Sequence, residues 1–139
     1  MQATRLFAAL LLTCAGQAFA AAAPAYLVVD HSTEILMNQA KAQALWEADL
    51  PAKLSKIYPV KKWGFVTEVE GGMDKDQNCV ITARTMMMPR NGKTLAFKPA
   101  KTATTYGMQS ASSLEQCQTL AKTKLSESIS AVRSALLKD

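Results

Sequence analysis

Three consecutive methionines, Met86 to Met88, carry the most distinctive chemistry in this sequence. Thioether sulfur and imidazole nitrogen are ligands of Cu(I), so His31, the single histidine, is the natural companion ligand. Successive side chains of a β-strand point to opposite faces, and only Met86 and Met88 could therefore share one ion. Met86, Met88 and His31 are the ligands expected if the protein binds a metal, although no spacing in the sequence requires one.

The same methionines suit contact with another protein, because a flexible thioether side chain adapts to surfaces of different shape. Their surroundings are basic, since no acidic residue occurs between Asp76 and Glu115. Such a surface would attract an acidic partner. The predicted contact residues are the outward-facing and basic ones of this region: Arg84, Met86, Met88, Arg90, Lys93 and Lys98. The alternative is that the methionines only pack beneath a loop or beneath residues 25–30.

A third alternative is a hydrolase or an isomerase in which His31 acts as a general base beside a carboxylate. Against it, the sequence lacks the G-x-S-x-G and H-E-x-x-H motifs and any glycine-rich phosphate loop. We therefore expect no catalytic residue and no cofactor. Nucleic acid is not an expected partner, because no aromatic residues alternate with the basic ones as single-strand binding requires.

The first twenty residues predict export from the cytoplasm. Arg5 precedes a short apolar run, and Ala18-Phe19-Ala20 matches the A-x-A pattern of signal-peptidase sites. A spanning helix needs about 20 apolar residues, more than this run supplies, so we expect no stable membrane anchor. We predict a signal peptide over residues 1–20 and one small domain over residues 21–139, with a loose lead-in over 21–25. The mature protein is then periplasmic or secreted.

Two cysteines remain after cleavage, Cys79 and Cys117, and an even number in an exported chain predicts a disulfide. The alternative is a pair of free thiols. Closing a loop of this length would stabilise the fold by about 4 kcal/mol, because it restricts the unfolded chain. No C-x-x-C motif occurs, so a thioredoxin-like redox role has no support.

Helices are expected on both sides of the methionine segment. The first begins at Ser32 as N-cap and is interrupted at Pro51, with Asp49 capping a second, short helix. The last covers residues 114–136 and is preceded by a capping box of Ser112 and Glu115. Its apolar positions recur every three or four residues: Leu114, Cys117, Ala121, Leu125, Ile129, Val132 and Leu136.

Three strands are expected between these helices. The first covers residues 62–70, where residues alternate in polarity, and the second runs from Cys79 through the methionines. Asn91-Gly92 predicts a hairpin and a third strand from Thr94, whose regular pairing Pro99 limits and which residues 100–108 could continue beyond the proline. Residues 25–30 are either a further strand or an extended arm. The predicted fold is α+β, a three- to four-stranded antiparallel meander with the N-terminal and C-terminal helices on one face.

The predicted disulfide decides which way the methionine strand faces. Cys117 lies on the apolar face of its helix, so Cys79 must point toward that helix. Alternation then sends Met87 inward and sends Arg84, Met86 and Met88 outward, unless a bulge reverses the register. We therefore expect an exported protein that binds another protein through the outward sheet face. An inhibitor, an immunity-type protein or an accessory subunit of an envelope complex would fit.

Overall fold

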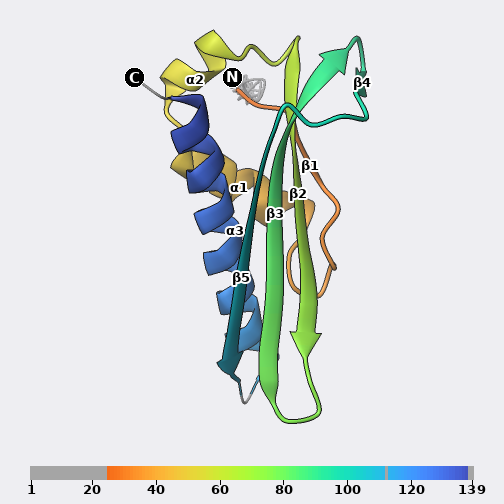
Figure 1. The fold of residues 1–139 in the computed structure, drawn as a ribbon, viewed down its shortest axis with the longest axis vertical. Helices are drawn as coiled ribbons and strands as arrows, with labels where there is room; N and C mark the ends of the chain where they lie inside the picture. The colour runs from red at the N-terminus through yellow and green to blue at the C-terminus, as the bar shows by residue number, and fades with distance from the viewer. Residues whose placement is uncertain (1–24, 112, 138–139) are drawn as a thin grey trace, which may run out of the picture.

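The computed structural model describes residues 25–111 and 113–137, which form a sheet with helices packed on one of its faces (Figure 1). The strands are β1 (Val28–Asp30), β2 (Trp63–Met73), β3 (Asn78–Asn91), β4 (Thr94–Leu95) and β5 (Lys101–Ser110). The helices are α1 (Gln39–Asp49), α2 (Ala52–Ile57) and α3 (Leu114–Leu136). The predicted α+β class is confirmed. The predicted signal peptide, residues 1–20, and residues 21–24 lie outside the described residues.

Three long strands, β2, β3 and β5, form the expected antiparallel meander, with the methionine strand β3 in the middle. The register between β2 and β3 runs without interruption from Trp63 opposite Pro89 to Met73 opposite Cys79. β1 extends the sheet at the β2 edge and pairs in parallel, which the sequence analysis did not predict. Parallel pairing is possible there because α1 and α2 supply a crossover connection of sufficient length.

The third strand of the meander begins later than predicted. Thr94 and Leu95 form only the two-residue strand β4, which closes the Asn91-Gly92 turn against β3. The chain then passes through Pro99 and returns to β3 at Lys101 as β5. Proline has no backbone N–H to donate to a ladder, so the long pairing resumes only beyond it.

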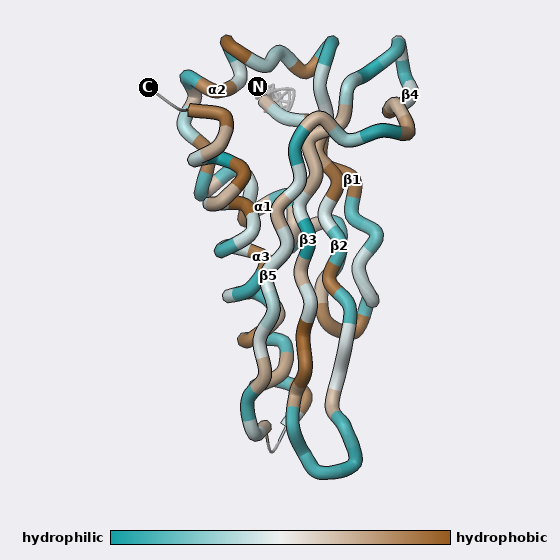
Figure 2. The backbone as a smooth tube through the Cα atoms, in the orientation of Figure 1, coloured by the Kyte–Doolittle hydropathy of each residue, from teal (hydrophilic) through white to brown (hydrophobic). Residues whose placement is uncertain are grey.

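The core lies between the sheet and the helices α1 and α3, and the disulfide crosses it. Cys79 and Cys117 are bonded, with their Cα atoms 5.4 Å apart. The inward-facing side of β3 is the predicted one, and all of its members are buried: Cys79, Ile81, Ala83, Thr85 and Met87. Figure 2 shows that hydrophilic residues gather instead at the loop that joins β2 to β3.

The first helix starts later than predicted. Its N-cap is Asn38, whose side chain accepts a hydrogen bond from Lys41 N at 3.1 Å. Ser32 instead links β1 to β2, because its hydroxyl donates to the Asp30 carboxylate at 2.6 Å and accepts from Val69 N at 2.9 Å. The sequence pattern did not reveal this competing use of the hydroxyl.

Two further caps differ from the prediction. Pro51 does interrupt the helix, but it is itself the N-cap of α2, and Asp49 accepts a hydrogen bond from Ser126 of α3. Ser113 caps α3, with its hydroxyl accepting from Gln116 N at 3.4 Å. Ser112 lies outside the described residues. The apolar face of α3 is buried as predicted except at its first position, Leu114, which is exposed.

Within the described residues, no helix is both long enough and apolar enough to span a membrane.

Candidate functional site

In the part of the chain that the structure describes, no helix covers the sheet face opposite α1 and α3, which we call the outer face (Figure 1). The register of β2, β3 and β5 arranges its side chains in rows, one residue from each strand. The rows differ in chemistry along the strands. Near the β2–β3 loop the outer face is apolar. In its middle it carries a row of charged residues. At the end beside β4, other segments of the chain cover it.

The two methionines expected on the outer face differ in exposure. Met86 is half-buried, whereas only 8% of Met88 is exposed. The cause is visible at Gly64, the residue opposite Met88 on β2. A Cβ atom on Gly64 would lie 2.7 Å from Cδ2 of Leu95 and 3.2 Å from Cδ2 of Leu27. These two leucines therefore cover this end of the outer face.

Packing beneath neighbouring segments is thus the alternative that the structure supports at Met88. Leu95 comes from β4 and Leu27 from the segment before β1, so a loop and residues 25–30 both contribute. Val66, which lies opposite Met86 on the outer face, is also only 5% exposed. This end of the outer face is a small second core, and Met88 has to be removed from the predicted contact residues.

Arg84 and Glu68 form the charged row in the middle of the outer face. Arg84 Nη1 lies 3.2 Å from Glu68 Oε2, and the two side chains are 46% and 26% exposed. Such an exposed pair contributes at most about 1 kcal/mol to stability. Arg84 can therefore exchange Glu68 for an acidic group of a partner at little cost.

His31 lies at the edge of this row, and no described residue is placed to act as its catalytic partner. It follows Asp30, which is in register with Thr67, and its imidazole makes no hydrogen bond or ion pair with another described residue. The Asp30 carboxylate is already bonded by the hydroxyls of Ser32 and Thr67, at 2.6 and 2.7 Å. A general base needs an oriented partner, and the described residues supply none to His31.

The ligand set considered for copper does not converge. His31 lies at the level of Glu68, whereas Met88 lies opposite Gly64, four residues away along β2. At 3.3 Å per residue this separation is about 13 Å, far beyond the span of one coordination sphere. Nor do the described residues bring three His, Cys, Asp or Glu side chains together in a group that could hold a metal ion.

The basic residues around the Asn91-Gly92 turn differ in their surroundings: Arg90 is held by other parts of the chain, whereas Lys93 and Lys98 are exposed. The Arg90 guanidinium donates to the carbonyl of Val60, and its Nε is buried without a partner among the described residues, so Arg90 ties the end of β3 to the segment before β2. Lys93 and Lys98 are exposed, and Phe97 beside Lys98 is fully exposed. Of the predicted contact residues, Arg84, Lys93 and Lys98 thus offer free surface, and Met86 offers part of its side chain.

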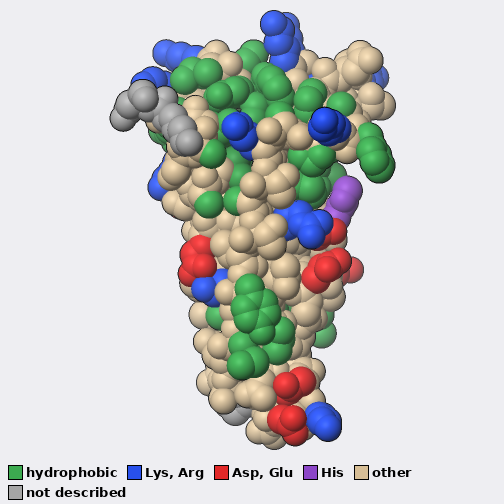
Figure 3. Space-filling model, in the orientation of Figure 1, with side chains coloured by type: hydrophobic (Ala, Val, Ile, Leu, Met, Phe, Trp, Pro, Cys, Tyr) green, Lys and Arg blue, Asp and Glu red, His purple; other side chains and the backbone are tan. Residues whose placement is uncertain are grey.

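The structure adds an apolar patch that the sequence analysis did not include. Tyr106 and Met108 of β5 are 62% and 61% exposed, and half-buried Val80 of β3 lies opposite Met108. We call these three residues the β5 patch. Figure 3 shows hydrophobic side chains gathered over this part of the sheet, below the charged row. Their spacing of two residues is the available signal, but it can be read only once β5 is known to begin beyond Pro99.

A groove of about 450 Å³ lies on the helical side of the molecule, between α1 and α3. Hydrogen bonds tie the two helical segments together at both ends, from Gln118 Nε2 to Ile35 O and from Ser126 Oγ to Asp49 Oδ2, each 2.6 Å. The groove is lined by apolar side chains and by charges of both signs: Leu36, Met37, Ala44, Leu45 and Ala48 with Lys41, Lys122 and Glu115. It therefore favours no particular charge on a ligand.

No family model, curated protein or solved structure matches this chain. What the protein does must therefore follow from its own surfaces. Among them the outer face combines an exposed apolar patch, a weakly held ion pair and free lysines.

Proposed function

We propose that this is an exported binding protein that acts by contact with another protein through the outer face of its sheet. The observation that carries the proposal is the exposure of Tyr106 and Met108, at 62% and 61%, on a face that no described helix covers. Large apolar side chains left together in water favour burial by a partner, since each square ångström removed from water contributes about 25 cal/mol.

The composition of the patch supports a protein as the partner. Exposed apolar patches with polar rims are typical of protein-contact sites. Tyrosine and methionine are enriched at such interfaces, because they bring large contact areas. The Arg84–Glu68 pair lies in the row next to Tyr106, so a partner that covers the β5 patch also reaches these charges.

The charges favour an acidic partner. Arg84, Lys93 and Lys98 have exposed side chains, and the formal net charge of the whole chain is +5. Complementary charge increases the rate at which partners meet and selects against basic competitors.

Export is supported by two features. The first twenty residues have the pattern of a signal peptide, and the Cys79–Cys117 bond suits an oxidising compartment such as the periplasm or the exterior of the cell. An inhibitor, an immunity-type protein or an accessory subunit of an envelope complex would combine these features.

Affinity capture from envelope extract, with tagged mature protein and identification by mass spectrometry, tests the proposal. The variant Tyr106→Ser/Met108→Ser removes the apolar surface of the β5 patch. The matched control is Ile35→Ser/Ile57→Ser, which removes two exposed isoleucines elsewhere. The proposal predicts a partner captured by the wild type and by the control and lost from the patch variant. Equal capture by all three proteins would refute it.

A further inference from the structure

One edge of β5 is paired with β3, and the other faces away from the sheet. In an antiparallel pair, successive residues direct their N–H and C=O groups to alternate edges. Ala111 N donates to Gln77 O at 2.9 Å, so in the observed register the odd-numbered residues of β5 bond to β3. The backbone groups that point away from β3 are those of the even-numbered residues: Thr102, Thr104, Tyr106 and Met108.

This second edge of β5 is open. Among the described strands β5 pairs only with β3, and all four of these residues are exposed. The edge strand on the other side of the sheet, β1, is covered, because the Gln39 side chain of α1 accepts from Asp30 N and donates to Val28 O, each at 2.9 Å. The fold thus protects one edge of its sheet and leaves the other unprotected.

β5 also lacks the features that usually prevent edge-to-edge association. Soluble proteins shorten such strands, bend them with bulges, or place proline and charged residues along them. β5 is ten residues long and in regular register, and its one charged residue, Lys101, is its first. Threonine and tyrosine favour extended structure. The strand is therefore a good template for another strand.

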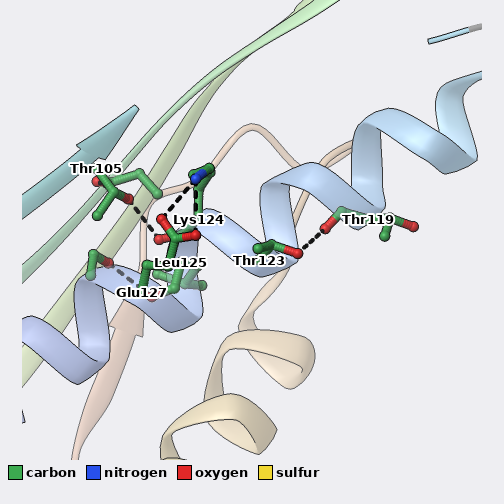
Figure 4. Close-up of polar contacts among 8 residues, drawn as sticks. Thr105, Thr119, Thr123, Lys124, Leu125 and Glu127 are labelled. Atoms are coloured by element: carbon green, nitrogen blue, oxygen red, sulfur yellow. Dashed lines mark hydrogen bonds and ion pairs between the residues drawn. The ribbon is translucent and has the colours of Figure 1, made fainter. Parts of the chain in front are cut away.

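The helix α3 contacts β5 from the inner face. Thr105 Oγ1 donates to the carbonyl of Lys124 at 2.7 Å (Figure 4), and the odd-numbered side chains such as Thr105 point inward. Lys124 Nζ in turn lies 2.8 Å from Glu127 Oε2, as Figure 4 also shows. The charges of α3 nearest to β5 therefore compensate each other and would not repel an approaching strand.

We propose that β5 pairs with β5 of a second copy of this chain, antiparallel and about a twofold axis, so that one sheet runs through the dimer. A register that sets Tyr106 opposite Met108 of the second copy uses only the free backbone groups, because both residues are even-numbered. It also places a thioether against an aromatic ring, a favourable contact.

The strand itself favours a second copy over a foreign peptide. Two uncharged, identical stretches meet without opposing like charges, and the twofold keeps the two Lys101 side chains at opposite ends of the pair. Each copy has one open edge, so the pairing closes at two chains and leaves no edge for further growth. The pairing uses the strand edge and does not depend on the proposed contact through the outer face.

Sedimentation equilibrium of the mature, disulfide-bonded protein over a series of concentrations tests the pairing. Thr104→Pro should abolish it, because residue 104 does not donate to β3, so the fold stays intact while the ring blocks a second strand. The variant Thr104→Lys/Tyr106→Lys, which needs no proline, should act in the same way by bringing like charges together. Thr82→Lys is the matched control, since it adds the same charge to the outer face on the central strand.

The proposal predicts twice the chain mass for the wild type and for Thr82→Lys, and the single-chain mass for both edge variants. It also predicts slow amide hydrogen exchange at residues 106 and 108 in the wild type and in Thr82→Lys, and faster exchange there in the edge variants. A wild type that stays monomeric up to its solubility limit would overturn it. So would a dimer that persists in both edge variants, or a monomer whose β5 edge takes up only foreign extended peptides.

Discussion

Cys79 of β3 is bonded to Cys117 of α3, and this bond fixes the side of β3 that faces the helix. Because strand side chains alternate, the bond also determines that Arg84 and Met86 lie on the outer face. The candidate contact surface therefore depends on the disulfide as much as the core does.

Reduction of the disulfide should lower the melting temperature. The bond joins two cysteines that are 38 residues apart in the sequence. Breaking it lets the unfolded chain adopt more conformations, which stabilises the unfolded state by about 4 kcal/mol. For a domain of this size that loss corresponds to a decrease of roughly 10–20 °C in Tm. Thermal unfolding with and without reductant measures it, and the variant Cys79→Ser/Cys117→Ser should not respond to reductant. An identical melting curve before and after reduction would mean that the bond contributes nothing.

Leu125→Ala should destabilise the protein by about 2–5 kcal/mol, because it leaves a cavity between α3 and the sheet. Leu125 is fully buried, whereas Leu114 on the same helix is exposed. The matched substitution Leu114→Ala should therefore change the free energy of unfolding by less than about 0.5 kcal/mol. Urea unfolding of both variants compares the two costs, and equal values would place Leu125 outside the core.

Thr85 and Ser128 form a buried hydroxyl pair with an oxygen–oxygen distance of 2.6 Å. Thr85→Val should cost about 0.5–1.5 kcal/mol, since it removes one hydrogen bond while the Ser128 hydroxyl keeps its bond to Leu125 O at 2.9 Å. The double variant Thr85→Val/Ser128→Ala should cost less than the sum of the two single changes, because neither partner then remains. A double-mutant cycle in urea measures the coupling, and strict additivity would show that the hydroxyls do not interact.

Hydrogen peroxide should oxidise Met108 well before Met88. Met108 is 61% exposed, whereas Met88 is 8% exposed beneath Leu27 and Leu95, and oxidation of methionine follows access to the sulfur. Peptide mass spectrometry over a time course measures both rates. Leu95→Ala should accelerate oxidation of Met88, and the distant Ile57→Ala should not. Equal rates at the two methionines in the wild type would contradict the cover over Met88.

The parts of the fold that could be predicted are those with strong local signals. The Asn91-Gly92 turn, the interruption at Pro51 and the apolar spacing of α3 each have a direct physical cause in the residues themselves. The inward face of β3 was also predictable. The apolar face of α3 carries Cys117, and the disulfide requires Cys79 of β3 to point toward it.

The rest depends on contacts between distant segments. Ser32 could cap a helix or bond the edge of β2, and only its position between Asp30 and the N–H group of Val69 decides between them. Met88 is covered because Leu27 and Leu95 meet over Gly64. The patch at Tyr106 and Met108 was missed because β5 consists mostly of threonine, small and polar residues, and two large apolar positions do not establish an apolar period.

The central claim is that the outer face binds a protein, and the most direct measurement is the amount of partner captured by matched variants. Tyr106→Ser/Met108→Ser and the control Ile35→Ser/Ile57→Ser are compared with the wild type in isotope-labelled capture from envelope extract. Loss of a central apolar contact typically costs more than about 1 kcal/mol, or about fivefold in affinity, and the patch variant removes two such side chains. We predict capture reduced about tenfold or more in the patch variant and unchanged in the control. A folded patch variant that captures as much partner as the wild type would contradict the account.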